Sequence, residues 1–158
     1  MTIRKAALFL IAALGTTGSA LSQTWEAEAA RMIAQNRKSH IDANVPPKDA
    51  FEAILQRDLE NYFRTEEGIA DADVAFTILN ERPAQIGVAL PKYYLWVRIS
   101  AHGADKGAGA VIVAAVDRKA FDILYYAPAT ALRSSNEAIS RFPEGLVPEI
   151  RRRAAPAD

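Results

Sequence analysis

Short connectors between apolar segments constrain the fold of this chain more than any other feature of its sequence. Residues 93–101, 108–116 and 121–127 are rich in β-branched and aromatic side chains and alternate in the manner of strands. The connectors at 102–107 and 117–120 are too short for a parallel crossover, which needs about a dozen residues or more. The segments are therefore predicted to form antiparallel hairpins, which excludes a doubly wound dinucleotide-binding sheet.

A helical segment precedes these strands. Its apolar residues recur at helical spacing, and Gly68 is expected to end it: Ala50, Phe51, Ile54, Leu55, Leu59, Tyr62 and Phe63. From about residue 73 the apolar period becomes alternating, which predicts a first strand at 74–79. Pro83, Gly87 and Pro91 interrupt the next segment, so a short edge strand at 86–90 stays an open alternative.

Helical signals return beyond Pro128. Ser134 and Glu137 have the spacing of a capping box. Pro143, Gly145 and Pro148 keep the predicted helices short. The apolar residues available for packing there are Ile139, Phe142, Leu146, Val147 and Ile150.

Together these segments predict an α+β fold, with a long helix packed on a bent antiparallel sheet of four or five strands and short helices at the carboxyl end. Over residues 48–127 this order resembles cystatin-like and nuclear-transport-factor-2-like rolls. The resemblance implies a roll, a fold that hosts inhibitors, adaptors, transport factors and small isomerases. It rests on no family motif and therefore assigns no functional residue.

The amino-terminal segment has the pattern of a secretory signal. Arg4 and Lys5 precede an apolar run at 6–14, and small and polar residues follow at 15–22. Cleavage after Ala20 and cleavage after Ser22 fit equally well. The run is shorter than the roughly 20 apolar residues of a membrane span, and no cysteine offers a lipid attachment point. We predict a periplasmic or secreted protein without a stable membrane anchor after cleavage.

The predicted organisation follows from these segments. The signal peptide occupies residues 1–22, and an amino-terminal helix with its linker occupies 23–46. Thr24 is expected to cap that helix, with Trp25, Ala29, Met32 and Ile33 on one face. A single α+β domain spans 47–153, and a tail spans 154–158.

Charge and composition disfavour several function classes. The chain has 19 basic and 19 acidic residues, and removal of Arg4 and Lys5 with the signal leaves 17 against 19. A net charge of −2 gives no general attraction to nucleic acid or anionic lipid. The chain has no cysteine, which excludes thiol catalysis. His40 and His102 are far apart and lack thiolate neighbours, so we predict no metal site. The sequence has no cofactor motif, so we predict no cofactor.

The expected strand register defines a candidate surface. This register pairs Val116 with Phe121, Ala114 with Ile123, Ile112 with Tyr125 and Ala101 with Ala108. It directs alternate residues toward the helix, including Tyr93, Leu95, Val97 and Ile99. The opposite face would then be a shallow trough, with small residues on its central strand: Gly109, Val111, Val113 and Ala115. Its predicted binding residues are Tyr94, Trp96, Arg98, Asp122, Leu124 and Tyr126.

Three occupants of this aromatic face remain open: the chain's own carboxyl-terminal segment, a second copy or another protein, and a small apolar ligand. The function favoured by the sequence is a non-enzymatic binding or interaction module. The alternative is a small cofactor-free enzyme, an isomerase or hydrolase, in which Asp122 acts as base beside Tyr94, Tyr126 and Arg98.

Overall fold

The computed structural model describes residues 28, 31–32, 43–85 and 89–156. The chain divides into two units, Met1–Arg37 and Lys38–Asp158. Glu28, Arg31 and Met32 are helical, and they are the only described residues of the helix predicted after Thr24. The predicted signal peptide lies outside the described residues, as do residues 86–88 of the uncertain edge strand.

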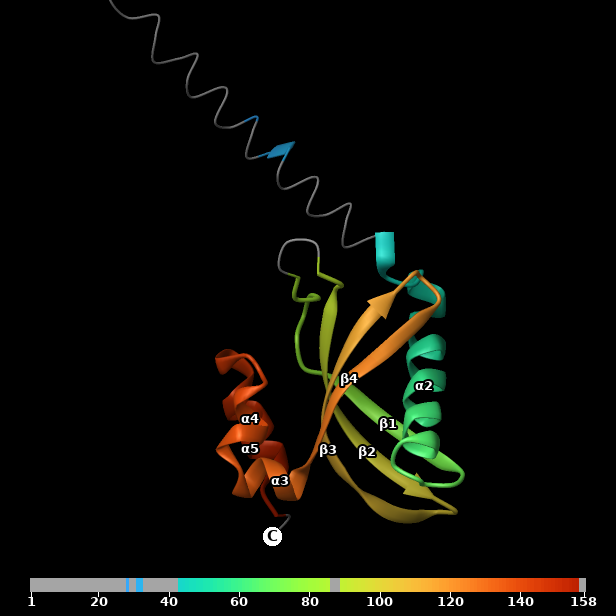
Figure 1. The fold of residues 1–158 in the computed structure, drawn as a ribbon, viewed down its shortest axis with the longest axis vertical. Coiled ribbons are helices and arrows are strands. Elements are labelled where there is room, and N and C mark those ends of the chain that lie inside the picture. Colours follow the sequence, from blue (N-terminus) through green and yellow to red (C-terminus); the bar gives the residue numbers. More distant parts are fainter. Residues whose placement is uncertain (1–27, 29–30, 33–42, 86–88, 157–158) are drawn as a thin grey trace, which may run out of the picture. The chain divides into compact units, whose positions relative to one another are not determined.

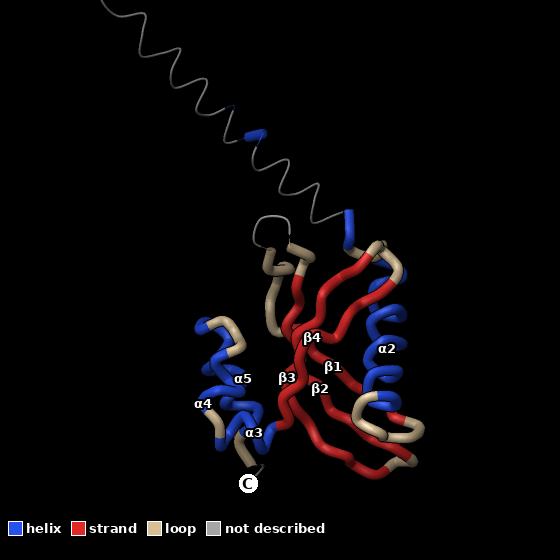
Figure 2. The backbone as a smooth tube through the Cα atoms, viewed as in Figure 1, coloured by secondary structure: helices blue, strands red, loops and turns tan. Residues whose placement is uncertain are grey.

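The second unit is α+β, with a helix packed on an open antiparallel sheet. Helix α2 spans Lys48–Thr65, and strands β1 (Ala72–Ile78), β2 (Lys92–Ala101), β3 (Ala104–Val116) and β4 (Ala120–Pro128) follow it. The strands pair in sequence order, β1-β2-β3-β4, and all pairs are antiparallel (Figures 1 and 2). The predicted hairpins are confirmed, and the described residues form four of the four or five predicted strands.

Helix α2 buries its apolar stripe against one face of the sheet. Leu55, Leu59 and Phe63 are fully buried there, each at 0% exposure, and each contributes about 1.5–3 kcal/mol by leaving water. Asp58 ties the helix to β4, because its Oδ2 accepts a hydrogen bond of 2.7 Å from the backbone N–H of Phe121. Beyond the helix, Gly68 has a φ of 68° and the chain turns into β1.

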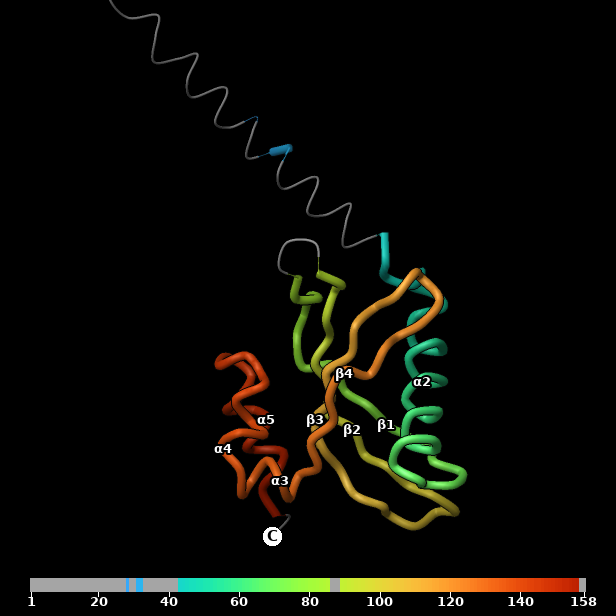
Figure 3. Tube along the Cα trace, in the orientation of Figure 1, coloured from blue at the N-terminus to red at the C-terminus, as the bar shows by residue number. Residues whose placement is uncertain are grey.

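A second helical layer covers part of the other face. Helices α3 (Ala129–Ser134), α4 (Asn136–Ser140) and α5 (Val147–Ala154), with the 3-10 turn η1 (Glu144–Leu146), lie across the sheet from α2 (Figures 1 and 3). Ser135, not the predicted Ser134, caps α4, and its Oγ accepts a hydrogen bond from the N–H of Ala138. The buried residues of this layer pack in one cluster with Tyr94, Trp96, Ala110, Ile112 and Ala127: Leu132, Ala138, Ile139, Phe142, Ile150 and Ala154.

This arrangement explains why β2 and β3 are almost continuously apolar. A strand covered on both faces needs apolar side chains at successive positions, as in buried parallel sheets. The residues from Tyr93 to Val97 are all buried, as are those from Gly109 to Ala115. The carboxyl-terminal segment, one of the three possible occupants, therefore covers the Tyr94 and Trp96 part of the aromatic face.

The predicted register between β2 and β3 is wrong. His102 and Gly103 both have positive φ and form a tight turn, so Ala101 pairs with Ala104 instead of Ala108. That shift of four residues alone would keep every side chain on its predicted face. A bulge then places Gly107, with a φ of 121°, opposite Ile99. The extra residue reverses the faces of β3.

The consequence is an exchange of side chains between the two layers. Val111, Val113 and Ala115 lie in the α2 cluster, although the sequence predicted them in the trough. Ile112, predicted beneath α2, packs under the carboxyl-terminal layer instead. The alternation on β2 is as predicted: Tyr93, Leu95, Val97 and Ile99 are in the α2 cluster.

The predicted register between β3 and β4 is correct only in part. Ile112 pairs with Tyr125 as predicted, but Phe121 pairs with Ala115 and Ile123 pairs with Val113. A bulge between these two regions leaves Leu124 without a partner in the ladder. The bulge turns Tyr126 toward α2 and Tyr125 toward the carboxyl-terminal layer.

Candidate binding surface

The structure disperses the six residues predicted to form one aromatic face. The exposed fractions of Tyr94 and Trp96 are only 9% and 6%, because the carboxyl-terminal layer covers both residues. Burial raises the pKa of the Tyr94 phenol. Arg98, two residues further along β2, is exposed. The predicted face is therefore closed over its aromatic part and open at its Arg98 end.

Tyr126 lies on the opposite face of the sheet from Arg98. Its ring stands edge-on to Phe63, with centroids 5.0 Å apart, in the α2 cluster. Burial, and to a lesser extent the charge of Glu67, raises the pKa of Tyr126 to about 12. The predicted neighbourhood of Arg98 and Tyr126 is wrong because the bulge in β4 reverses this end of the strand.

Asp122 and Leu124 are exposed on β4, away from Arg98. Asp122 pairs with Ala114, which pairs with Lys92 on β2. Arg98 pairs with Ala108 and is six residues further along β2 than Lys92. Six residues along a strand correspond to about 20 Å. Asp122, Arg98 and Tyr126, which the enzymatic alternative requires together, are therefore not gathered at one place.

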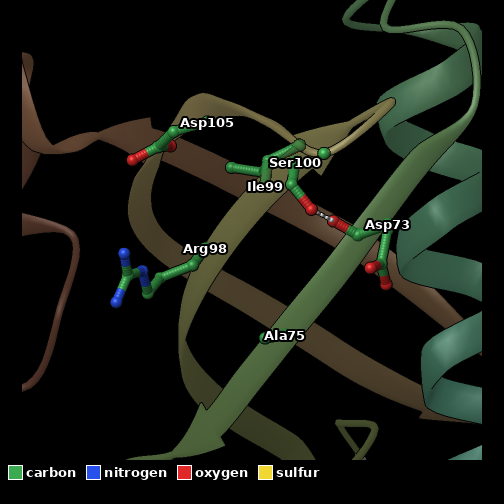
Figure 4. A pocket seen from close by; sticks show the side chains of 7 residues that line it. Asp73, Ala75, Arg98, Ile99, Ser100 and Asp105 are labelled. Carbon is green, nitrogen blue, oxygen red and sulfur yellow. Dashed lines mark hydrogen bonds between the residues drawn. The ribbon is translucent and has the colours of Figure 1, made fainter.

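A hollow of about 330 Å³ lies at the open end of the face. Strands β1 and β2 and the hairpin after β2 supply its lining, and Figure 4 shows Asp73 and Ala75 on β1, Arg98 and Ser100 on β2, and Asp105 beyond the hairpin. The lining residues are Asp73, Ala75, Arg98, Ile99, Ser100, Gly103 and Asp105. We call this hollow, with these residues, the Arg98 pocket.

Strand pairing fixes the positions of the pocket's side chains. Ala75 pairs with Arg98, and Asp73 pairs with Ser100. Val74 and Ile99 alternate with these residues and face α2. The side chains of Asp73, Ala75 and Arg98 must therefore share the face opposite α2.

Charge in the Arg98 pocket is mixed and partly unpaired. Within the described residues, neither Arg98 nor Asp73 takes part in a salt bridge. Asp105 is engaged locally, since its Oδ1 accepts a hydrogen bond of 2.7 Å from the N–H of Gly107. An exposed guanidinium beside a small residue is suited to bind a carboxylate, because it presents several N–H donors in a fixed plane.

The pocket adjoins an open sheet edge. Among the described strands, β1 pairs only with β2, so its other edge has backbone groups available for pairing. Asp73, Ala75 and Thr77 are exposed along it. Of the pocket residues only Arg98 was predicted from the sequence. The period of two over residues 73–77 was a signal only for the shared face of Asp73 and Ala75.

No protein-family model, curated protein or solved structure matches this chain. In the described part of the chain, no group of three or more histidine, aspartate or glutamate side chains is arranged to hold a metal ion. No helix in that part is long and apolar enough to cross a membrane.

Proposed function

We propose that this chain is a non-enzymatic interaction module that binds a protein partner through the Arg98 pocket and the adjoining edge of β1. The observation that carries the proposal is the exposed guanidinium of Arg98, unpaired within the described residues, in a hollow beside an open strand edge. An extended segment can pair with such an edge through its backbone, while pockets select its side chains. Arg98 would select a carboxylate.

The Arg98 end of the face fits a partner better than its aromatic part. A small apolar ligand on Tyr94 and Trp96 would have to displace buried residues such as Ile139 and Phe142. A segment along β1 displaces none of them. Asp122 as a catalytic base gains no support from its exposed position, since Tyr126 is on the other face.

A designed heptapeptide tests this proposal. In acetyl-Val-Thr-Val-Glu-Val-Lys-Val-amide, paired antiparallel to β1, the Glu lies opposite Ala75 and the Lys opposite Asp73. We expect labelled peptide to bind, by fluorescence anisotropy, about two- to fivefold more tightly than its Glu-to-Gln version, the worth of one exposed ion pair. Arg98→Gln should remove the difference.

Arg64→Gln is the matched control, because Arg64 is exposed on α2 and lies outside the pocket. This variant should keep the preference for the Glu peptide. Equal affinity of the wild type for the two peptides, or no binding of either at millimolar concentration, would refute the proposal.

We propose that the chain is exported to the periplasm or secreted, on the strength of the charged, apolar and small-residue order within residues 1–22. Amino-terminal sequencing of the exported protein should begin at Leu21 or at Gln23. Recovery of the protein only in the cytoplasm with Met1 retained would contradict export.

We also propose, as a finer description of the fold, a cystatin-like or nuclear-transport-factor-2-like roll. A helix followed by sequential antiparallel strands supports this description, as do contacts of α2 with both outer strands, β1 and β4. An experimental structure in which the sheet is flat beneath α2 would contradict it.

A further inference from the structure

The two outer strands of the sheet differ in how they are protected against pairing. Strand β4 is interrupted by a bulge and ends at Pro128, two features that discourage edge pairing. Strand β1 has a continuous register over Ala72–Ile78 and contains no proline, lysine or arginine. Its only charged residue is Asp73. Within the part of the chain that the structure describes, strand β1 is therefore the edge that is open to another strand.

We infer that the partner of this edge is a second copy of the chain, joined β1 to β1 in antiparallel fashion about a two-fold axis at Val74. This inference rests on the proposed function and specifies its partner. An isologous contact of this kind requires a surface that complements itself, as most soluble dimers have.

Charge supplies the self-complementarity. With Val74 opposite Val74 of the second copy, Ala75 lies opposite the partner's Asp73. Arg98 on β2 pairs with Ala75 on β1 of the same copy. One row across the dimer therefore contains Arg98, Ala75 and the partner's Asp73. Two strand spacings, about 10 Å between Cα atoms, separate the charged residues. The small Ala75 leaves the long arginine side chain free to reach over it, and symmetry forms the same pair twice.

The other face of the joined strands is also compatible. Phe76 lies opposite the partner's Ala72, a large residue against a small one, and the backbones of the two Val74 residues meet at the axis. Val74 is buried and Phe76 is partly buried in the α2 cluster. A pairing centred at Asp73 would instead oppose two like charges, which is unfavourable.

Charge reversal in mixed samples tests the inference. Arg98→Asp alone sets a new carboxylate against the partner's Asp73, and Asp73→Arg alone sets a second guanidinium against Arg98, so each variant repels its own copy. In an equimolar mixture the two variants should pair with each other. In such a mixed dimer, one row joins the two substituted positions, which have opposite charges, and the other row joins the native Arg98 and Asp73. By sedimentation velocity, we expect a wild-type dimer and at least tenfold weaker self-association of each single variant.

The double variant Arg98→Asp with Asp73→Arg restores the complementarity within one chain, because both charges of every row are exchanged. It should associate about as tightly as the wild type, whereas Arg64→Asp, which alters a charge on α2 outside the contact, should leave association unchanged. Far-ultraviolet circular dichroism of all variants verifies that they are folded, as expected for substitutions at exposed positions.

The outcomes separate this inference from the proposed function. A monomeric wild type at millimolar concentration, or a double variant that associates no better than the single variants, overturns the dimer. If the Glu peptide still binds in an Arg98-dependent manner in that case, the interaction module remains and its partner is another protein.

Discussion

Replacing Trp96 by alanine should lower the free energy of unfolding by about 3–5 kcal/mol, the usual cost of removing a buried aromatic side chain. Trp96 is only 6% exposed and packs in the cluster that the carboxyl-terminal helices form with β2 and β3. Urea denaturation followed by circular dichroism measures the loss. Had Trp96 been an open anchor for a partner, the same substitution would leave the unfolding midpoint almost unchanged.

Two companion variants assign that loss to the carboxyl-terminal layer. Ile150→Ala, on α5, should cost about 2–5 kcal/mol because Ile150 is completely buried. Arg98→Ala, two residues from Trp96 but exposed, should stay within about 0.5 kcal/mol of the wild type. Losses below about 1 kcal/mol at both Trp96 and Ile150 would mean that the carboxyl-terminal helices do not cover the sheet.

Gly109→Ala should also destabilise the fold strongly. A Cβ at this position would collide with the backbone oxygen of Ala127 and would lie 2.6 Å from Cε2 of Tyr126. The backbone of β4 cannot move away without disturbing its pairing, so we expect a loss of about 3 kcal/mol, the upper part of the range for overpacked cores. Thermal or urea unfolding provides the measurement.

Gly145→Ala is the control for this substitution, since a Cβ at Gly145 meets no atom within 4 Å. Its effect should be within about 0.5 kcal/mol. A small effect at Gly109 would contradict the observed register, because the close approach of β3 and β4 there depends on the pairing of Gly109 with Pro128.

The elements of the fold were predictable from the sequence, whereas the faces of β3 were not. Helical spacing from Phe51 to Phe63 and short connectors define α2 and the hairpins. The direction of a β3 side chain depends on one extra residue at the bulge beside Gly107, and a single-residue shift reverses a whole strand. No periodicity reveals such a bulge when both faces of the strand are apolar.

The candidate site was predictable only at Arg98. Tyr94 and Trp96 were correctly placed on the face opposite α2, and the covering carboxyl-terminal segment was one of three open alternatives. Asp73 and Ala75 could not be joined to Arg98 because no partner had been assigned to the first strand. Tyr126 was misplaced because the bulge at Leu124 is recognisable only from the pairing of Ile112 with Tyr125 and of Val113 with Ile123.

Binding at the Arg98 end of the sheet should leave the carboxyl-terminal layer closed. Amide chemical shifts of the isotopically labelled chain, recorded while the Glu peptide is added, show which residues the peptide contacts. We predict shift changes confined to residues 73–77 and 98–105, with the amides of Trp96, Phe142 and Ile150 unchanged. Changes concentrated at Tyr94, Trp96 and the carboxyl-terminal helices would instead place binding on the aromatic part of the face and refute binding at Arg98.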